Sequence, residues 1–174
     1  DDGVVIKSGR NRDAWRLHTP TENVLVRNCR IVNAHTIFGI GSEISGGVRN
    51  VRMENCTGDV VTRAVYIKTN HRRGGFVENV SVANVACKEA KVSVFGIGTD
   101  VLYEWAEFPE YETAITEISN ISVSNIICGK AAFDIRICGD KRRPVKGVRV
   151  SDLKVGEITG CGRRLENVDD FVCK

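Results

Sequence analysis

The sequence predicts an all-β fold, a right-handed parallel β-helix, and two observations support this prediction. A six-residue pattern with apolar second and fourth positions recurs along the 174-residue chain. The composition combines many Val, Ile, Gly and Asn residues with only 6% aromatics, which is typical of short strands joined by tight turns. One such unit cannot bury its own apolar face, so successive units must stack as a solenoid.

The first repeated row consists of hexapeptides such as Asn-Val-Leu-Val-Arg-Asn. The copies begin at Asn23, Asn50, Asn79, Asn120 and Gly147, at intervals of 27, 29, 41 and 27 residues. Their alternation of apolar and polar residues indicates a strand with one buried face. The Asn or Asp that closes each copy suits a turn, because these side chains bond to nearby backbone and tolerate left-handed conformations.

A second row of short strands recurs between the copies of the first. Each member is an Ile followed by Lys or Gly and then by Ser or Thr, at Ile6, Ile40, Ile67 and Ile97. Each unit therefore holds at least two strands within about 30 residues, with no helical pattern between them. The use of Val and Ile instead of regularly spaced Leu argues against leucine-rich repeats. The antiparallel turn signals of a propeller are missing as well.

The chain is expected to form a single domain over residues 1–174, a partial β-helix without a linker. It opens on two Asp residues directly before a strand, so we expect the solenoid to be truncated on its N-terminal side. The chain alone would then be inactive and poorly soluble. The acidic and aromatic stretch 100–113 is interpreted as a loop that could wall a cleft. Residues 165–173 are expected to form a final partial coil.

Charge and hydropathy argue against several kinds of partner. The net charge of +3 is too small to indicate a polyanionic partner, and no nucleic-acid-binding motif accompanies the basic clusters. No apolar run approaches the roughly 18 residues of a membrane span. We therefore expect neither a nucleic acid nor a membrane as a partner.

The seven cysteines lack Cys-x-x-Cys spacing, which argues against a zinc site. Equivalent positions of the repeat pair Cys29 with Cys56 and Cys87 with Cys128. We expect these four residues to be small buried hydrophobes that stack coil on coil. Nearer the C-terminus, Cys161 and Cys173 could pair with each other.

Stacking of the units should bring polar residues from several coils to one side. Alignment on the second row places Asp1 or Asp2, then His35, then Tyr66 and Lys68 on one face of consecutive coils. Glycoside hydrolysis needs one carboxylic acid to protonate the leaving oxygen and one carboxylate to activate water or to attack. A nearby His can tune the protonation of a carboxyl group, and a Lys supplies a fixed positive charge for an acidic sugar.

These residues resemble the pattern of glycoside hydrolase family 28, the polygalacturonase family of pectin-degrading enzymes. The first matching segment is an Asp-Asp pair followed by an apolar strand and Lys-Ser-Gly. The matching segments are residues 1–9, 20–24, 27–29, 34–36, 40–43, 45–51, 66–68 and 73–75. Together they cover residues 1–85 densely, while the later coils match only as a β-helix pattern.

The resemblance implies an inverting hydrolase that cuts α-1,4-linked galacturonate or a related pectic bond. Asp1 would be the general acid, and Asp2 would be a base that activates water. His35 would support the protonation and position of the acid. Lys68 would bind a galacturonate carboxylate, with Tyr66 beside it as a second substrate-binding residue. No metal and no organic cofactor is implied.

Three departures from the family pattern bear on specificity. A third acidic residue, in an Asn-Thr-Asp motif upstream of the Asp pair, is absent from the chain. Ala34 and Thr36 replace the two glycines around His35, and Tyr66 stands where the family has an Arg. These changes leave room for an exo-polygalacturonase or an enzyme that cuts rhamnogalacturonan. The lost guanidinium could be replaced by Arg63, Arg72 or Arg73.

The resemblance further implies a pectic poly- or oligosaccharide substrate, a monomeric enzyme and a secreted or periplasmic location. Two alternatives remain open. A pectate lyase would need clustered carboxylates for Ca²⁺ and a basic proton acceptor, and no ladder of Asp and Glu runs across the coils. A non-catalytic carbohydrate-binding or structural β-helix would share the fold without the reaction.

Overall fold

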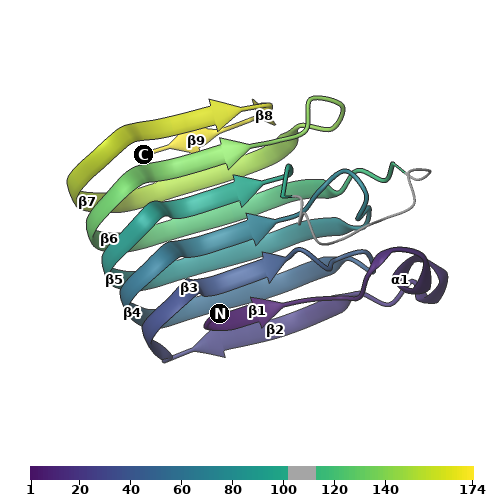
Figure 1. Cartoon of the computed structure of the whole chain (residues 1–174), viewed down its shortest axis with the longest axis horizontal. Coiled ribbons are helices and arrows are strands. Elements are labelled where there is room, and N and C mark those ends of the chain that lie inside the picture. The colour runs from purple at the N-terminus through teal and green to yellow at the C-terminus, as the bar shows by residue number, and fades with distance from the viewer. Residues whose placement is uncertain (102–112) are drawn as a thin grey trace.

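The computed structural model, which describes residues 1–101 and 113–174, is a parallel β-helix (Figure 1). Its named strands belong to one sheet, and every pair of neighbouring strands is parallel. The predicted fold class is therefore confirmed. The strands are β1 (Val4–Ile6), β2 (Thr21–Arg27), β3 (Arg30–Gly41), β4 (Val48–Lys68), β5 (Phe76–Gly98), β6 (Glu117–Cys138), β7 (Val145–Glu166), β8 (Val168–Asp169) and β9 (Val172–Cys173).

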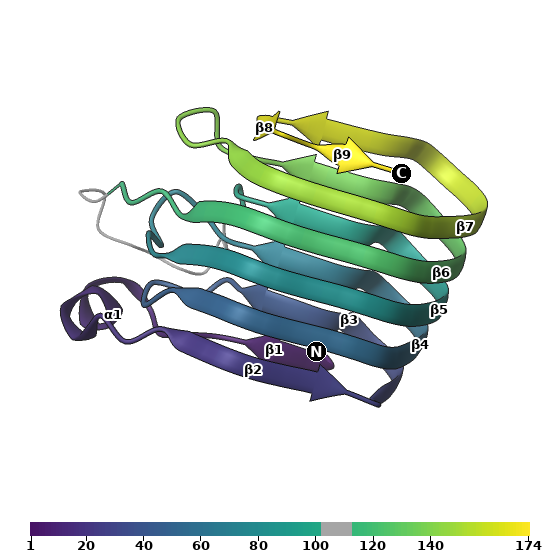
Figure 2. The same ribbon diagram turned by 180° about the vertical axis from the view of Figure 1, so that it is seen from behind.

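The long strands β4 to β7 each form most of one coil. Figures 1 and 2 show that the N-terminal part of each runs along one side of the molecule and the C-terminal part returns along the other. Asparagines with left-handed backbone lie within these strands, among them Asn50, Asn79 and Asn120 with φ of 54°, 54° and 55°. These residues open the repeated hexapeptides. The residues that close them, Asn55, Asn84 and Asn125, also have left-handed backbone, in agreement with the turn chemistry expected there.

The core is built from columns of apolar side chains that stack in register. The second repeated row forms one such column, in which Ile6, Ile40, Ile67, Ile97 and Ile137 are aligned from β1 to β6. All five side chains are buried. Burial of a branched aliphatic side chain contributes roughly 1.5–3 kcal/mol, and each side chain of the column packs against the coils on either side.

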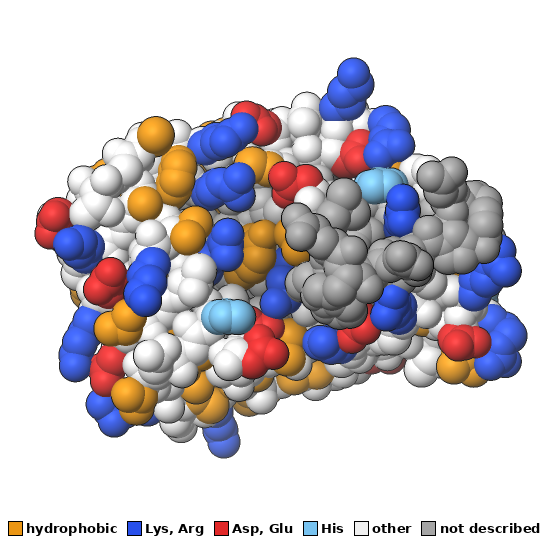
Figure 3. Space-filling model, viewed as in Figure 1, with side chains coloured by type: hydrophobic (Ala, Val, Ile, Leu, Met, Phe, Trp, Pro, Cys, Tyr) orange, Lys and Arg blue, Asp and Glu red, His pale blue; other side chains and the backbone are white. Residues whose placement is uncertain are grey.

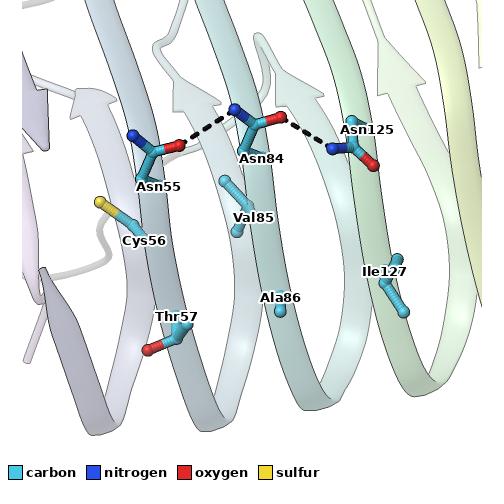
Figure 4. Close-up of a pocket in the computed structure, with 8 residues that line it drawn as sticks. All are labelled: Asn55, Cys56, Thr57, Asn84, Val85, Ala86, Asn125 and Ile127. Carbon is cyan, nitrogen blue, oxygen red and sulfur yellow. Dashed lines mark hydrogen bonds between the residues drawn. The ribbon is translucent and has the colours of Figure 1, made fainter. Parts of the chain in front are cut away.

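Asparagine side chains form a second kind of column at a corner of the coil. The amide of Asn84 donates to Asn55 Oδ1 at 3.0 Å, and the amide of Asn125 donates to Asn84 Oδ1 at 2.7 Å (Figure 4). All three residues have positive φ. The ladder therefore ties β4, β5 and β6 together at the position where the backbone turns.

Cys56, Cys87 and Cys128 are buried as expected from the repeat, whereas Cys29, on the first of these coils, is only half-buried. Cys87 of β5 is in register with Cys128 of β6, and both side chains are buried. The backbone N–H of Cys29 donates to Cys56 Sγ on the next coil at 3.4 Å. The pair considered near the C-terminus is not formed, because Cys161 and Cys173 are exposed free thiols.

One short helix, α1 (Asn11–Leu17), departs from the expected run of strands. The indole N–H of Trp15 donates to the Arg73 carbonyl at 2.9 Å, and Arg73 Nη1 donates to Asn11 Oδ1 at 2.8 Å. Seven residues are too few to display a helical period, so the repeat gave no sign of it. Within the part of the chain that the structure describes, no helix is long and apolar enough to cross a membrane.

Two expectations concern the later part of the chain. The stretch 100–113, interpreted as a loop that walls a cleft, lies almost entirely outside the described residues. Just before the gap, the backbone N–H of Val101 donates to the Thr69 carbonyl at 3.0 Å. At the C-terminal end, β8 and β9 both pair with β7 and form the partial coil that the sequence predicted.

Candidate active site

The Asp pair lies directly before β1, and the parallel register brings two further coils beside it. The backbone N–H of His35 donates to the Asp1 carbonyl at 2.9 Å, and the N–H of Gly3 donates to the Thr36 carbonyl at 2.8 Å. The next coil, β4, ends at Lys68, whose ammonium group reaches the pair from 66 positions away in the sequence. The structure thus brings together the residues that the repeat register predicted.

Asp2 is the buried member of the pair, and its side chain is only 8% exposed. Lys68 Nζ donates to Asp2 Oδ2 at 2.7 Å, and Thr36 Oγ1 donates to Asp2 Oδ1 at 2.8 Å. Burial raises the pKa of Asp2, but the hydrogen bonds from Lys68 and Thr36 and the nearby positive charge together outweigh it. The net result is a pKa below the usual value of 3.8. Asp2 is therefore a carboxylate at neutral pH.

Asp1 is the exposed member, with 92% of its side chain accessible to solvent. Its Oδ1 atom accepts a hydrogen bond from the backbone N–H of Asp2 at 2.9 Å and lies 3.3 Å from His35 Nδ1. The imidazole is itself largely exposed. Adjacent residues of the chain thus offer one carboxyl group at the surface beside a His and another held by a Lys.

A pocket of about 350 Å³ adjoins this cluster. Figure 3 shows the face on which β1 and the N-terminus lie in Figure 1, where Lys and Arg side chains are plentiful among acidic and His side chains. The lining residues are Asp2, His35, Thr36, Thr62, Arg63, Tyr66, Lys68 and Val101. Two cationic side chains, one imidazole and one buried carboxylate therefore border a space large enough for part of a sugar chain.

Tyr66 lies against the coil that follows it and is 7% exposed. Its register partners are Gly39 on one side and Gly96 on the other. A Cβ atom at Gly98 would lie 2.5 Å from the Tyr66 hydroxyl oxygen, so the glycine leaves the space that the phenol fills. The guanidinium carbon of Arg63 lies 4.2 Å from the centroid of the Tyr66 ring, at cation–π distance.

The structure distinguishes the three arginines considered as substitutes for the missing family Arg. Arg73 is 2% exposed, and its Nη1 atom holds Asn11 at the start of α1. Arg72 Nε donates to His71 Nε2 at 3.4 Å, on the turn that follows β4. Among these three, Arg63 is the one that lines the pocket.

Thr36 is a site residue whose role the sequence analysis did not assign. It was considered only as the replacement of a family glycine. Its position offered a signal, since Thr36 lies four residues before Ile40 just as Asp2 lies four residues before Ile6. Equivalent positions on neighbouring coils stack, so the hydroxyl of one meets the carboxylate of the other.

Asp1, Asp2 and His35 come closest to a metal-ligand set among the described residues, with ligand atoms within 4.8 Å of one another. The arrangement suits a cation poorly. Both Asp2 oxygens already accept hydrogen bonds, and the Lys68 ammonium group lies 2.7 Å from one of them. A second positive charge at this spacing would be repelled.

The chain is similar in sequence and in fold to known polygalacturonases. A "Probable polygalacturonase" from Vitis vinifera is 25% identical over 161 residues, which is 89% of this chain and 31% of the relative. The crystal structure of a hyperthermoactive exopolygalacturonase from Thermotoga maritima superposes with a TM-score of 0.81 at 34% identity, over 89% of this chain and 34% of the other. The chain thus spans about a third of either relative. The model of glycosyl hydrolases family 28 matches residues 1–173, and the chain belongs to that family.

Proposed function

We propose that the protein carrying this chain is an inverting glycoside hydrolase of galacturonate-containing pectic substrates, acting as an exo-polygalacturonase. The observation that supports this proposal most directly is the Asp1–Asp2 pair. One of its carboxyl groups is exposed beside His35, and the other is buried and ionised. Family membership supports glycosidic chemistry. The 34% identity to an exopolygalacturonase supports exo action over cleavage of rhamnogalacturonan.

The two environments suggest the division of labour. Asp2, held as a carboxylate by Lys68 and Thr36, suits the base that takes a proton from water. Asp1 suits the general acid, because the other carboxyl group of the pair is already ionised and His35 Nδ1, 3.3 Å away, can position the Asp1 carboxyl group. The proton of Asp1 would pass to the leaving glycosidic oxygen, and the proton of water would pass to the base.

The spacing of the pair bears on the stereochemical course. Inverting enzymes keep their two carboxyl groups about 6.5–9.5 Å apart to leave room for water, whereas Asp1 and Asp2 oxygens come within 4.8 Å. Inversion therefore requires that the water is held jointly by Asp2 and by the third acidic residue of the family pattern, which this chain lacks. For the same reason we propose that the 174-residue chain alone binds substrate without turning it over.

The proposal extends to the setting in which the enzyme works. A pectic polysaccharide is the substrate expected of the family, and a secreted or periplasmic monomer is the form that fits a large extracellular polymer. Family membership supports both the location and the monomeric state.

The direct test measures reducing ends released by the full-length protein from polygalacturonate, from rhamnogalacturonan and from their oligomers. We expect galacturonate monomers as the first product, with the anomeric configuration inverted in proton NMR spectra. Asp1→Asn should lower kcat by about 10²–10⁴-fold, the range typical of general acid–base catalysis. Asp59→Asn is the control, since Asp59 pairs with Arg30 and Lys88 outside the pocket.

Failure to release reducing ends from any of these substrates would overturn the proposal. Full activity of the Asp1→Asn enzyme would overturn the assigned role of Asp1. Retention of the anomeric configuration would leave the hydrolase in place and remove the inverting mechanism.

A further inference from the structure

A uronate substrate brings a carboxylate into the pocket, and Lys68 is already engaged. Its ammonium group is hydrogen-bonded to Asp2 at 2.7 Å, and its side chain is only 14% exposed. A second carboxylate on the same nitrogen would compete with the bond that keeps Asp2 ionised. The substrate therefore calls for another cation at this position.

Arg63 meets this requirement, because it lines the pocket and has an N–H group without a hydrogen-bond partner among the described residues. It lies on β4, lines the same pocket as Asp2 and Lys68, and is half-buried. Its Nε atom is buried without a hydrogen-bond partner among the described residues. A guanidinium edge with a buried, unsatisfied N–H is suited to a planar carboxylate, which accepts two parallel hydrogen bonds.

Tyr66 holds the guanidinium in place. The Arg63 guanidinium carbon stands 4.2 Å from the ring centroid. The ring is itself fixed, because it lies over Gly96 and Gly98 of β5 in a space that side chains would fill. Stacking on an aromatic face restrains a guanidinium without using its N–H groups, which stay available for an anion.

We propose that Arg63, stacked on Tyr66, is the specificity-determining residue that binds the carboxylate of a uronate ring in this pocket. The Arg that the family pattern has at position 66 is thus displaced by three residues along the same strand, and Tyr66 serves as its platform. Lys68 then acts mainly on Asp2. This inference rests on the proposed function, because it assigns a contact to the substrate of that reaction.

The test compares an acidic ligand with its neutral form. Binding of trigalacturonate and of its methyl ester is measured by calorimetry on the full-length protein with Asp1→Asn, which stops turnover. Arg63→Gln should weaken binding of trigalacturonate by about 10- to 100-fold, the loss expected for a charge-assisted pair. Binding of the methyl ester should change by less than about threefold. Arg63→Lys keeps the positive charge but lacks the paired N–H donors of the guanidinium. Its affinity for trigalacturonate should therefore lie between those of the unaltered residue and of Arg63→Gln.

Arg149→Gln is the matched control, since it removes the same charge from an exposed position on β7. If Arg63→Gln weakens binding of trigalacturonate and of its methyl ester equally, Arg63 has only a structural role and the inference is overturned. An unchanged ratio of acid to ester affinity would overturn it as well. If Arg63→Gln fails to fold, the ratio of acid to ester affinity in Arg63→Lys decides the question. Binding with the predicted preference but no hydrolysis by the unaltered protein would overturn the proposed function and leave the Arg63 assignment standing.

Discussion

At the scale of single residues, the neighbours of the two aspartates give them different environments. Asp2 is enclosed by Thr36 and Lys68, whereas Asp1 faces solvent with His35 beside it. Local sequence does not distinguish the two residues, since they are adjacent and chemically identical. The distinction comes from side chains one and two coils away, so a substitution on those coils should change the chemistry of the pair.

Lys68→Met tests this coupling through the pH dependence. The substitution removes the hydrogen bond and the charge that lower the pKa of Asp2, and the raising effect of burial remains. The pKa of Asp2 should therefore rise, and the acid limb of kcat/KM should move to higher pH. Carboxyl carbon NMR titration reads the same pKa without turnover. The control is Lys7→Met, which removes an exposed ion pair with Glu43. It should leave the acid limb of the kcat/KM profile at the same pH.

Asp2 should also make stability depend on pH. Its pKa is lower in the folded chain than in the unfolded chain, so the unfolded state takes up the proton first as pH falls. The stabilisation is fully present above the unfolded value and is lost as pH falls through the folded value. Denaturant unfolding of the unaltered protein and of Asp2→Asn should therefore differ most at neutral pH. A difference that grows on acidification would contradict this.

At the scale of elements, the asparagine ladder fixes a corner of three coils. Asn84 combines a left-handed backbone with bonds to Asn55 and Asn125. Asn84→Ala should lower the free energy of unfolding by about 1–3 kcal/mol, since it loses both bonds and the short polar side chain that makes a left-handed backbone tolerable. Asn84→Gly keeps the backbone preference and should cost less. Equal losses in denaturant unfolding would show that backbone conformation contributes nothing.

The contact between Tyr66 and β5 gives a second prediction at this scale. Gly98→Ala places a Cβ 2.5 Å from the Tyr66 hydroxyl oxygen, so the phenol must move. We expect a destabilisation of about 1–3 kcal/mol, as for overpacking, measured by thermal unfolding. The double variant with Tyr66→Phe removes the clashing oxygen and should recover most of the loss. No recovery would show that the cost comes from elsewhere.

At the scale of the whole molecule, each coil is stabilised by the coils on either side. β5 pairs along its full length with β4 and β6, whereas β8 and β9 are two-residue strands paired only with β7. Stability in such a solenoid is a sum over neighbours. Hydrogen exchange followed by mass spectrometry should show the slowest amides in β5 and the fastest in β8 and β9. Uniform protection along the chain would contradict this.

The sequence predicted those features that repeat from coil to coil. Stacking of Ile6, Ile40 and Ile67 followed from the spacing of the second row, and so did the approach of Lys68 to Asp2. Features that occur once were not predictable in this way. α1 leaves no periodic signal, and the stacking of Arg63 on a ring depends on side-chain torsions that no spacing specifies.

The connections between successive coils lie along one rim, where Figure 1 shows α1 and the described loops together. The opposite corners are turned within continuous strands, where successive coils differ only by short register shifts. The longer connections lie at the rim, which adjoins the pocket at Val101. Under the proposed function, exchange of rim segments would change which branched or esterified saccharide enters the pocket, while the scaffold that aligns Asp2 with Lys68 stays the same.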